Sequence, residues 1–569
     1  MSVDAHVSRL FGRDSLYMVL WAVQLGCAAL LTPVLTRFLG TGEFGTVAAA
    51  NTVMQVLFVV GGFGLQTAIQ RAYARNGPAD ARRIVALAIV LACAVTALAL
   101  VTASGWARPL GLTGELPALR LAIVWAGLSA VTNASLGLLR SQDRLAAFAL
   151  VSLAQSAVAE AASLGLVALV RPTAENFLLG QALLQVVAAL IGLALAPPHR
   201  LRLADAPMLR AALTYALPLV PAVLGLLILS TADRLMIQAA LGADAVARYQ
   251  VAYNVASGPI LLLGVLNTAW MPRFFALAED GERAAVLAAS RDLLYRLLVP
   301  LVAGVAIGAP FVLRVWAPPS YRPEDLYWVF SLVVVAAVPF AAQLALHRAL
   351  VAAGHTGVVA VAVCAAAAAN LLLNRLLLPP LGLAGAALAT TLAYGLLYLG
   401  LRRGAAATAP VPPPPGRLRV LIAASVVVSL AVAAVPDIPV LLGVRAALVL
   451  GTMIWFFRVL AGLRRLSVPR TPHAAPSPSG NSSPGVGAGA GVPVAGASVS
   501  DAPQARVPGE ARCACAHADT CTSRTACASV AACTSGDACA SADACTSPDA
   551  GVPSGVCVPS DACVCRAVS

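Results

Sequence analysis

Long apolar runs separated by short polar connections occupy most of the first 466 residues. A helix needs about 20 residues to cross the hydrocarbon of a bilayer, and only helices or closed barrels satisfy their backbone there. The runs lack two-residue alternation, so we predict helices rather than barrel strands. Fourteen candidate spans follow, at 16–35, 44–65, 84–104, 117–139, 147–170, 177–196, 211–230, 250–270, 294–315, 327–350, 357–378, 382–401, 418–435 and 440–459.

A weak internal repeat groups these spans. Leu-Gly occurs at 39–40 and again at 241–242, and the segment 47–51 (VAAAN) resembles 250–254 (QVAYN). The alternative is chance similarity between Ala/Val-rich segments, but the offset also superposes the order of the helices. We therefore expect two six-helix halves of parallel topology. The predicted domains are a first bundle at 1–210, a second at 211–401, two further helices at 402–466 and a tail at 467–569.

Composition agrees with a polytopic membrane protein. The chain has 569 residues, of which 60% are hydrophobic and 11% charged, and its mean hydropathy is +0.85. Such a composition excludes a soluble enzyme, a nucleic-acid-binding protein and a disordered scaffold. We expect an all-α polytopic fold, no enzymatic activity and no cofactor.

The net charge of +13 comes from 38 basic residues, all of them arginine. Arginine is more than twice as frequent in every second connection, starting with the N-terminus. The positive-inside rule places that set, and with it both termini, in the cytoplasm. The arginine-only, alanine-rich composition also indicates a GC-rich bacterial genome, and so a bacterial plasma membrane.

The tail, 467–569, is rich in Pro, Ser, Gly and Ala and carries ten of the 13 cysteines. Cysteines recur every six residues from 515 to 545, a spacing unlike that of zinc fingers. A soft metal is the minority interpretation. We predict a disordered cytoplasmic segment of low complexity without a metal site.

Polar groups inside lipid are costly and therefore mark helix contacts or function. Glu160 lies near the middle of one apolar run. It titrates, pairs with an arginine across a cavity or contacts a cation, or else it forms a neutral, hydrogen-bonded contact between helices. Asp233-Arg234 ends the seventh span, where it either closes a gate across the halves or forms an interfacial pair. Arg37 shares this ambiguity at the outer side.

Arg71 and Arg140, at inner helix ends, are topology anchors or attract an anionic head group. Amides recur in the spans, and Asn51, Asn254 and Asn267 are candidates to line a cavity. Together they suit a neutral polyhydroxylated cargo such as sugar, although each alone is explained as interhelical glue. Residues 279–296 are predicted to form an amphipathic surface helix linking spans eight and nine.

Two stretches resemble a known family. Residues 31–45 (LTPVLTRFLGTGEFG) are similar to the exit of the first helix in polysaccharide-type flippases of the multidrug/oligosaccharidyl-lipid/polysaccharide superfamily. Residues 217–237, with TADRLMI at 231–237, and YQVA at 249–252 resemble the seventh helix of that family and its exit. The likeness covers about 8–460. Ala247-Arg248 departs from the usual glycine, which puts the local packing in question.

The resemblance implies two six-helix bundles in a V around a partly cationic cavity, with two extra C-terminal helices. It implies alternating access that moves a polyprenyl-pyrophosphate-linked oligosaccharide between leaflets. The implied partners are this cargo, membrane lipids and a polysaccharide polymerase or glycosyltransferase, with the chain itself a monomer.

Other functions stay open at this point. Lipid II flippases carry an Arg-Asp pair within the first helix, whereas Arg13-Asp14 here precedes it. Cation-coupled multidrug exporters often place a carboxylate in that same helix, and none is found there. A membrane glycosyltransferase or polymerase would need a larger outer loop with acidic residues, and a scaffold recruiting synthesis enzymes is the remaining class.

Overall fold

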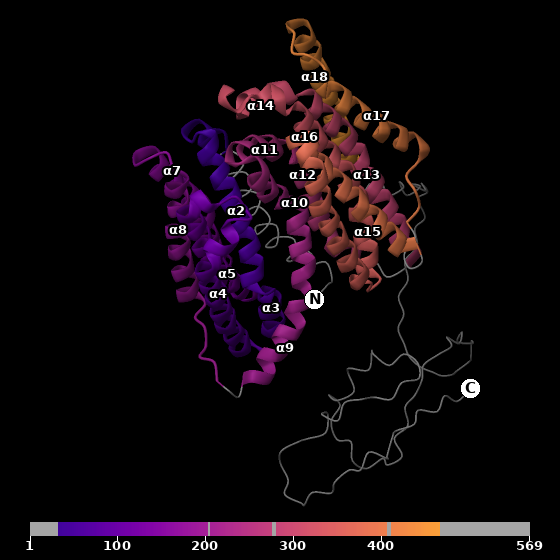
Figure 1. Ribbon diagram of the computed structural model, residues 1–569. Helices are drawn as coiled ribbons and strands as arrows, with labels where there is room; N and C mark the ends of the chain where they lie inside the picture. Colours follow the sequence, from indigo (N-terminus) through magenta and orange to yellow (C-terminus); the bar gives the residue numbers. More distant parts are fainter. Residues whose placement is uncertain (1–31, 203–204, 276–279, 407–410, 467–569) are drawn as a thin grey trace, which may run out of the picture. The chain divides into compact units, whose positions relative to one another are not determined.

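The computed structural model describes residues 32–202, 205–275, 280–406 and 411–466 (Figure 1). The chain divides into two units, 1–472 and 473–569, and all described residues belong to the first. Most of the first predicted span, 16–35, and the predicted tail therefore lie outside the described residues. Residues 32–38, at the end of that span, are helical.

The first bundle contains five described spans. Leu65–Asn76 continues Thr41–Gly62 after a break at Phe63 and Gly64, which both have positive φ. Their helices are α2 (Thr41–Gly62) with α3 (Leu65–Asn76), α4 (Pro78–Ala107), α5 (Leu116–Ser141), α6 (Leu145–Leu153) with α7 (Ala159–Leu169), and α8 (Ala174–Leu195).

The rest of the described chain forms the second bundle and the two additional helices. Its helices are α9 (Ala206–Ala216), α10 (Val220–Leu241), α11 (Ala243–Ala256), α12 (Gly258–Phe275), α13 (Asp280–Ile307), α14 (Ala309–Trp316), α15 (Tyr327–Ala352), α16 (Thr356–Ala406), α17 (Gly416–Ala433) and α18 (Pro439–Leu466).

The helices reproduce the predicted spans. The described residues hold 10 helices long and apolar enough to cross a membrane, or 12 if two bent pairs are counted as spans. These pairs are α11 with α12, bent by 49°, and α13 with α14, bent by 64°. α16 covers two predicted spans, which a backbone break at Gly382 (φ 56°) separates. The all-α polytopic fold is confirmed, and no strand occurs in the part of the chain that is described.

One local prediction is wrong. Residues 279–296 do not form a separate surface helix, because α13 runs without interruption from Asp280 to Ile307. Leu294, Leu298 and Val302 of this helix belong to the buried core of the second bundle, with Phe330 and Val334 of α15. The charged residues at the start of α13 thus extend the ninth span instead of linking it to the eighth.

The two bundles meet along α2, which packs against α10 and α11 (Figure 1). Gly45 allows this approach, because a Cβ there would lie only 1.8 Å from the carbonyl oxygen of Ala243. The Tyr321 hydroxyl donates to the Leu39 carbonyl at 3.4 Å, and burial raises the pKa of this phenol. These contacts lie at connections predicted to face away from the cytoplasm.

The span Ala206–Leu241 belongs to both bundles. At its start, α9 packs on the first bundle, where Ala212 and Ala216 join the core formed by Leu65, Ala68 and their neighbours. Further along, α10 packs on α16, and Leu229 lies in a core with Val363. Pro218 and Pro221 occur between these two portions. The predicted boundary at residue 210 therefore falls within a helix that contacts the first bundle.

Candidate functional site

A cavity of about 520 Å³ lies where the two bundles meet, a size typical of ligand-binding sites. Both bundles supply its walls, since α2, α5, α7 and α8 line it on one side and α10, α11 and α12 on the other. Both polar and aromatic side chains line it. The polar members are Thr32, Asn51, Gln55, Gln155, Ser156, Glu160, Gln181, Arg234, Gln250, Asn254 and Ser257, and the aromatic ones are Phe44, Trp125, Phe177, Tyr253 and Trp316.

A π-helical turn shapes the wall of the first bundle. Residues 154–158 form this turn between α6 and α7, just before Glu160. Five residues exceed one α-helical turn of 3.6 residues, so the wider π turn lets Gln155 and Glu160 face the same cavity. Glu160 is partly buried and, among the described residues, has neither a hydrogen-bond partner nor an ion pair. Insertions of this type recur at functional sites.

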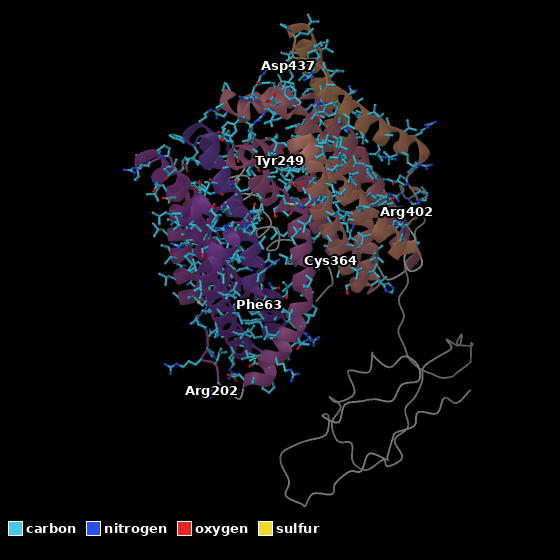
Figure 2. All side chains as sticks on the ribbon, viewed as in Figure 1. Phe63, Arg202, Tyr249, Cys364, Arg402 and Asp437 are labelled. Atoms are coloured by element: carbon cyan, nitrogen blue, oxygen red, sulfur yellow. The ribbon has the colours of Figure 1, made fainter. Side chains whose placement is uncertain are left out.

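An ion pair forms the opposite wall. The Arg234 guanidinium lies 2.6 Å from an Asp233 carboxylate oxygen, and the two side chains are 5% and 2% exposed. The Tyr249 hydroxyl donates to the other oxygen of Asp233 at 2.5 Å, and Figure 2 shows Tyr249 among the side chains of the second bundle. The Arg234 guanidinium also lies 3.9 Å from the centre of the Tyr253 ring. Asp233 and Arg234 thus pair with each other here, and a role in closing a gate across the halves stays a prediction.

A chain of polar side chains leads from this ion pair to the first bundle. Arg234 donates to Gln250 at 2.9 Å, Gln250 to Asn254 at 2.6 Å and Asn254 to Thr32 at 3.1 Å. Asn51, the counterpart of Asn254 in the sequence repeat, lines the same cavity. The two repeated amides therefore meet in one site, as the repeat predicts for two equivalent halves.

The cavity is less cationic than the resemblance implies. Among its described lining residues, Arg234 and Glu160 are the formally charged ones. Asp233 neutralises Arg234 directly, so Glu160 adds a negative charge to a wall that otherwise consists of amides, hydroxyls, aromatic rings and aliphatic side chains. Such a surface can hydrogen-bond a neutral polar molecule through donors and acceptors together. No group of three or more metal-ligating side chains occurs in the described ranges.

Comparison with known proteins decides the family. The family profile described as "Polysaccharide biosynthesis protein" matches residues 34–323, which include the stretch from α2 to α14 and every described lining residue of the cavity except Thr32. The chain belongs to this family. No curated protein matches the sequence at a significant level.

The fold of this family member is similar to two solved transporters. A lipid II flippase MurJ, in an inward closed conformation, matches with a TM-score of 0.60 and 12% identity over 79% of this chain and 99% of its own. An inward-facing multidrug resistance MATE family transporter of the MOP superfamily matches with a TM-score of 0.54 and 14% identity, over 70% and 95%. These likenesses establish the fold, and the resemblance to polysaccharide-type flippases is confirmed.

Five predicted site residues lie outside the cavity lining, and one of them is Asp233, which contacts Arg234 of the wall. Arg37 donates to the carbonyls of Pro33 and Val315, at 2.6 Å and 2.9 Å, on the side predicted to be outer. Arg71 lies over the Tyr215 ring, with 4.3 Å between guanidinium carbon and ring centre. Arg140 is exposed at the end of α5. The buried side-chain oxygen of Asn267 has no hydrogen-bond partner among the described residues.

The sequence does not predict the aromatic part of the lining. Trp125, Phe177, Tyr253 and Trp316 contact the cavity, yet an aromatic residue in an apolar helix carries no signal that separates cavity from core. Gln250 was also missed, although it lies four residues before Asn254 and thus on the same helical face. That spacing was the signal available for it.

Proposed function

We propose that this protein translocates a polyprenyl-pyrophosphate-linked oligosaccharide across a bacterial plasma membrane by alternating access, for cell-surface polysaccharide synthesis. The observation that carries the proposal is the cavity between the bundles, with its amides, hydroxyls and aromatic rings. A glycan needs hydrogen bonds to replace water, while its polyprenyl tail can remain in lipid. The family and the flippase-like fold support the same assignment.

Alternating access fits the way in which the bundles contact each other. The hydrogen bonds from Arg37 to Val315 and from Tyr321 to Leu39 join them at the predicted outer side. Movement of one bundle against the other would break these contacts and transfer the cavity opening between leaflets. Both termini are proposed to be cytoplasmic, and the proposed partners are a polysaccharide polymerase or glycosyltransferase.

The decisive experiment is leaflet-resolved translocation in proteoliposomes. The cargoes are a polyprenyl-pyrophosphate oligosaccharide and, separately, lipid II, and head-group accessibility is followed with time. Protein-dependent appearance of the oligosaccharide in the opposite leaflet is expected. If the protein moves lipid II selectively, lipid II is the cargo and the proposed oligosaccharide is not. If folded protein moves neither lipid, the flippase proposal is overturned.

One observation favours a second candidate, a cation-coupled exporter of small molecules. Glu160 faces the cavity without a described partner, which leaves its carboxylate open to a proton or sodium ion. Export of a soluble compound that depends on an ion gradient, and is lost in Glu160→Gln, would support this function. If the Glu160→Gln variant still exports the compound with the same response to the ion gradient, this second function is contradicted.

A further inference from the structure

A second polar site lies away from the cavity, where α3 contacts α9. Two adjoining hollows of about 290 Å³ and 720 Å³ open here, and both are lined by Arg71, Ala211 and Tyr215. Arg75 lines the smaller hollow and Arg210 the larger one. Three guanidinium groups from two helices therefore surround one continuous region.

The charges at these hollows are unbalanced. No Asp or Glu lines either hollow within the described residues. The nearby carboxylates have other partners, because Asp80 binds Arg83 at 2.8 Å and Asp205 lies 3.5 Å from the same guanidinium. Arg71 and Arg75 are four residues apart and so share one face of α3, where like charges repel. An anion bound between these groups would remove that repulsion.

The shape of the smaller hollow indicates what kind of anion fits. Its remaining lining is largely apolar and includes Ala68, Ala72, Ile84 and Met208. A cationic rim above an apolar floor suits an amphiphile, whose phosphate binds arginine while its chain contacts hydrocarbon. Stacking on Tyr215 holds the Arg71 guanidinium in place before any ligand arrives.

We propose that Arg71, Arg75 and Arg210 form a binding site for a lipid phosphate, separate from the cavity that accepts the sugar. Among the described residues, the cavity lining holds one arginine, already paired with Asp233, so this part of the cavity is poorly suited to a diphosphate. Charge and glycan are thus handled at two places. The identification of this lipid as the cargo's polyprenyl diphosphate rests on the proposed function, and an anionic phospholipid is the other source of the same chemistry.

The test is lipid retention by the purified full-length protein in native mass spectrometry. The probes are farnesyl diphosphate, phosphatidylglycerol and phosphatidylcholine. The variant is the triple substitution Arg71→Gln, Arg75→Gln and Arg210→Gln, and the control is Arg402→Gln. Arg402 is an exposed residue of α16, in the other bundle (Figure 2). The distribution of arginines along the sequence predicts that it faces the cytoplasm, as Arg71, Arg75 and Arg210 do.

Wild type should retain farnesyl diphosphate at least about tenfold better than the triple variant does, since each arginine adds a charged hydrogen bond. Arg402→Gln should bind as wild type does. Equal, arginine-dependent retention of phosphatidylglycerol would support the phosphate site and assign it to the surrounding lipid. Unchanged retention of both anionic lipids by the triple variant would overturn the site.

A parallel translocation assay separates this proposal from the function. If the wild-type protein flips the lipid-linked oligosaccharide, but the triple variant binds farnesyl diphosphate as well as wild type does, only the phosphate site is refuted. If the wild-type protein moves no lipid, but the triple variant loses the farnesyl diphosphate binding that wild type shows, the flippase function is refuted and the phosphate site is supported. Arg71→Lys alone keeps the charge but not the planar guanidinium. It should therefore bind farnesyl diphosphate less well than wild type and better than the triple variant.

Discussion

Removal of the Asp233 carboxylate tests whether the cavity wall depends on charge balance. Asp233 is 1% exposed and accepts hydrogen bonds from Arg234 and from Tyr249. Asp233→Ala leaves the guanidinium of Arg234, a residue that is 4% exposed, without its counter-charge. Breaking one member of a buried ion pair costs about 3–5 kcal/mol, and the orphaned Tyr249 hydroxyl adds about 1–3 kcal/mol in isolation. Because neighbouring losses do not add fully, we expect about 4–6 kcal/mol in total.

The double variant Asp233→Ala/Arg234→Met provides the internal control. It removes both charges together, so the large term disappears and only packing and hydroxyl losses remain, about 1–3 kcal/mol. Equilibrium unfolding in mixed micelles, followed by the fluorescence of the 7 tryptophans, measures both values. If the single and double variants lose equal stability, the charge argument is refuted.

Three further predictions concern the bundle contacts and the cavity. Gly45→Ala should lower the free energy of unfolding by about 1–3 kcal/mol, because it overpacks the α2–α11 contact. Gly40→Ala, with open space around it, should be tolerated in the same unfolding assay. Equal losses of stability in the two variants would contradict the packing argument. Tyr321→Phe should lower the free energy of unfolding by about 0.5–1.5 kcal/mol, because it loses the hydrogen bond to the Leu39 carbonyl. Thermal unfolding unchanged from wild type would show that this bond does not contribute to stability. Asn254→Ala should slow oligosaccharide translocation about three- to tenfold, as expected for one neutral hydrogen bond, and a wild-type rate in proteoliposomes would remove this amide from the site.

The sequence predicts the helices well because lipid imposes a length and an apolar composition on every span. It also predicts Glu160, Asn51 and Asn254 as cavity residues, since polar groups in lipid are costly unless they face a polar space. The repeat adds weight to the two asparagines. Burial cost is thus the physical reason why these three could be found without coordinates.

Other features depend on contacts that no single span reveals. The π turn at 154–158 leaves no clear mark in the local sequence, yet it brings Gln155 and Glu160 to the same cavity. Arg37 donates to the carbonyl of Val315, which is distant in sequence, so its charge misleads as a cavity signal. The Tyr249 hydroxyl that donates to Asp233 belongs to the next helix, so the seventh span alone does not reveal this contact.

The span Ala206–Leu241 has a consequence for biogenesis. Its first part packs on α3 and its second on α16, so it can complete its contacts only after α16, inserted much later, is present. Gly64, directly before α3, approaches Ala216 so closely that an added Cβ would lie 2.9 Å from the Ala216 carbonyl oxygen. We therefore expect nascent chains that end before α16 to leave the side of α10 that faces α16 uncovered, even though α2 and α11 already contact this helix, and such chains should be substrates for membrane quality-control proteases.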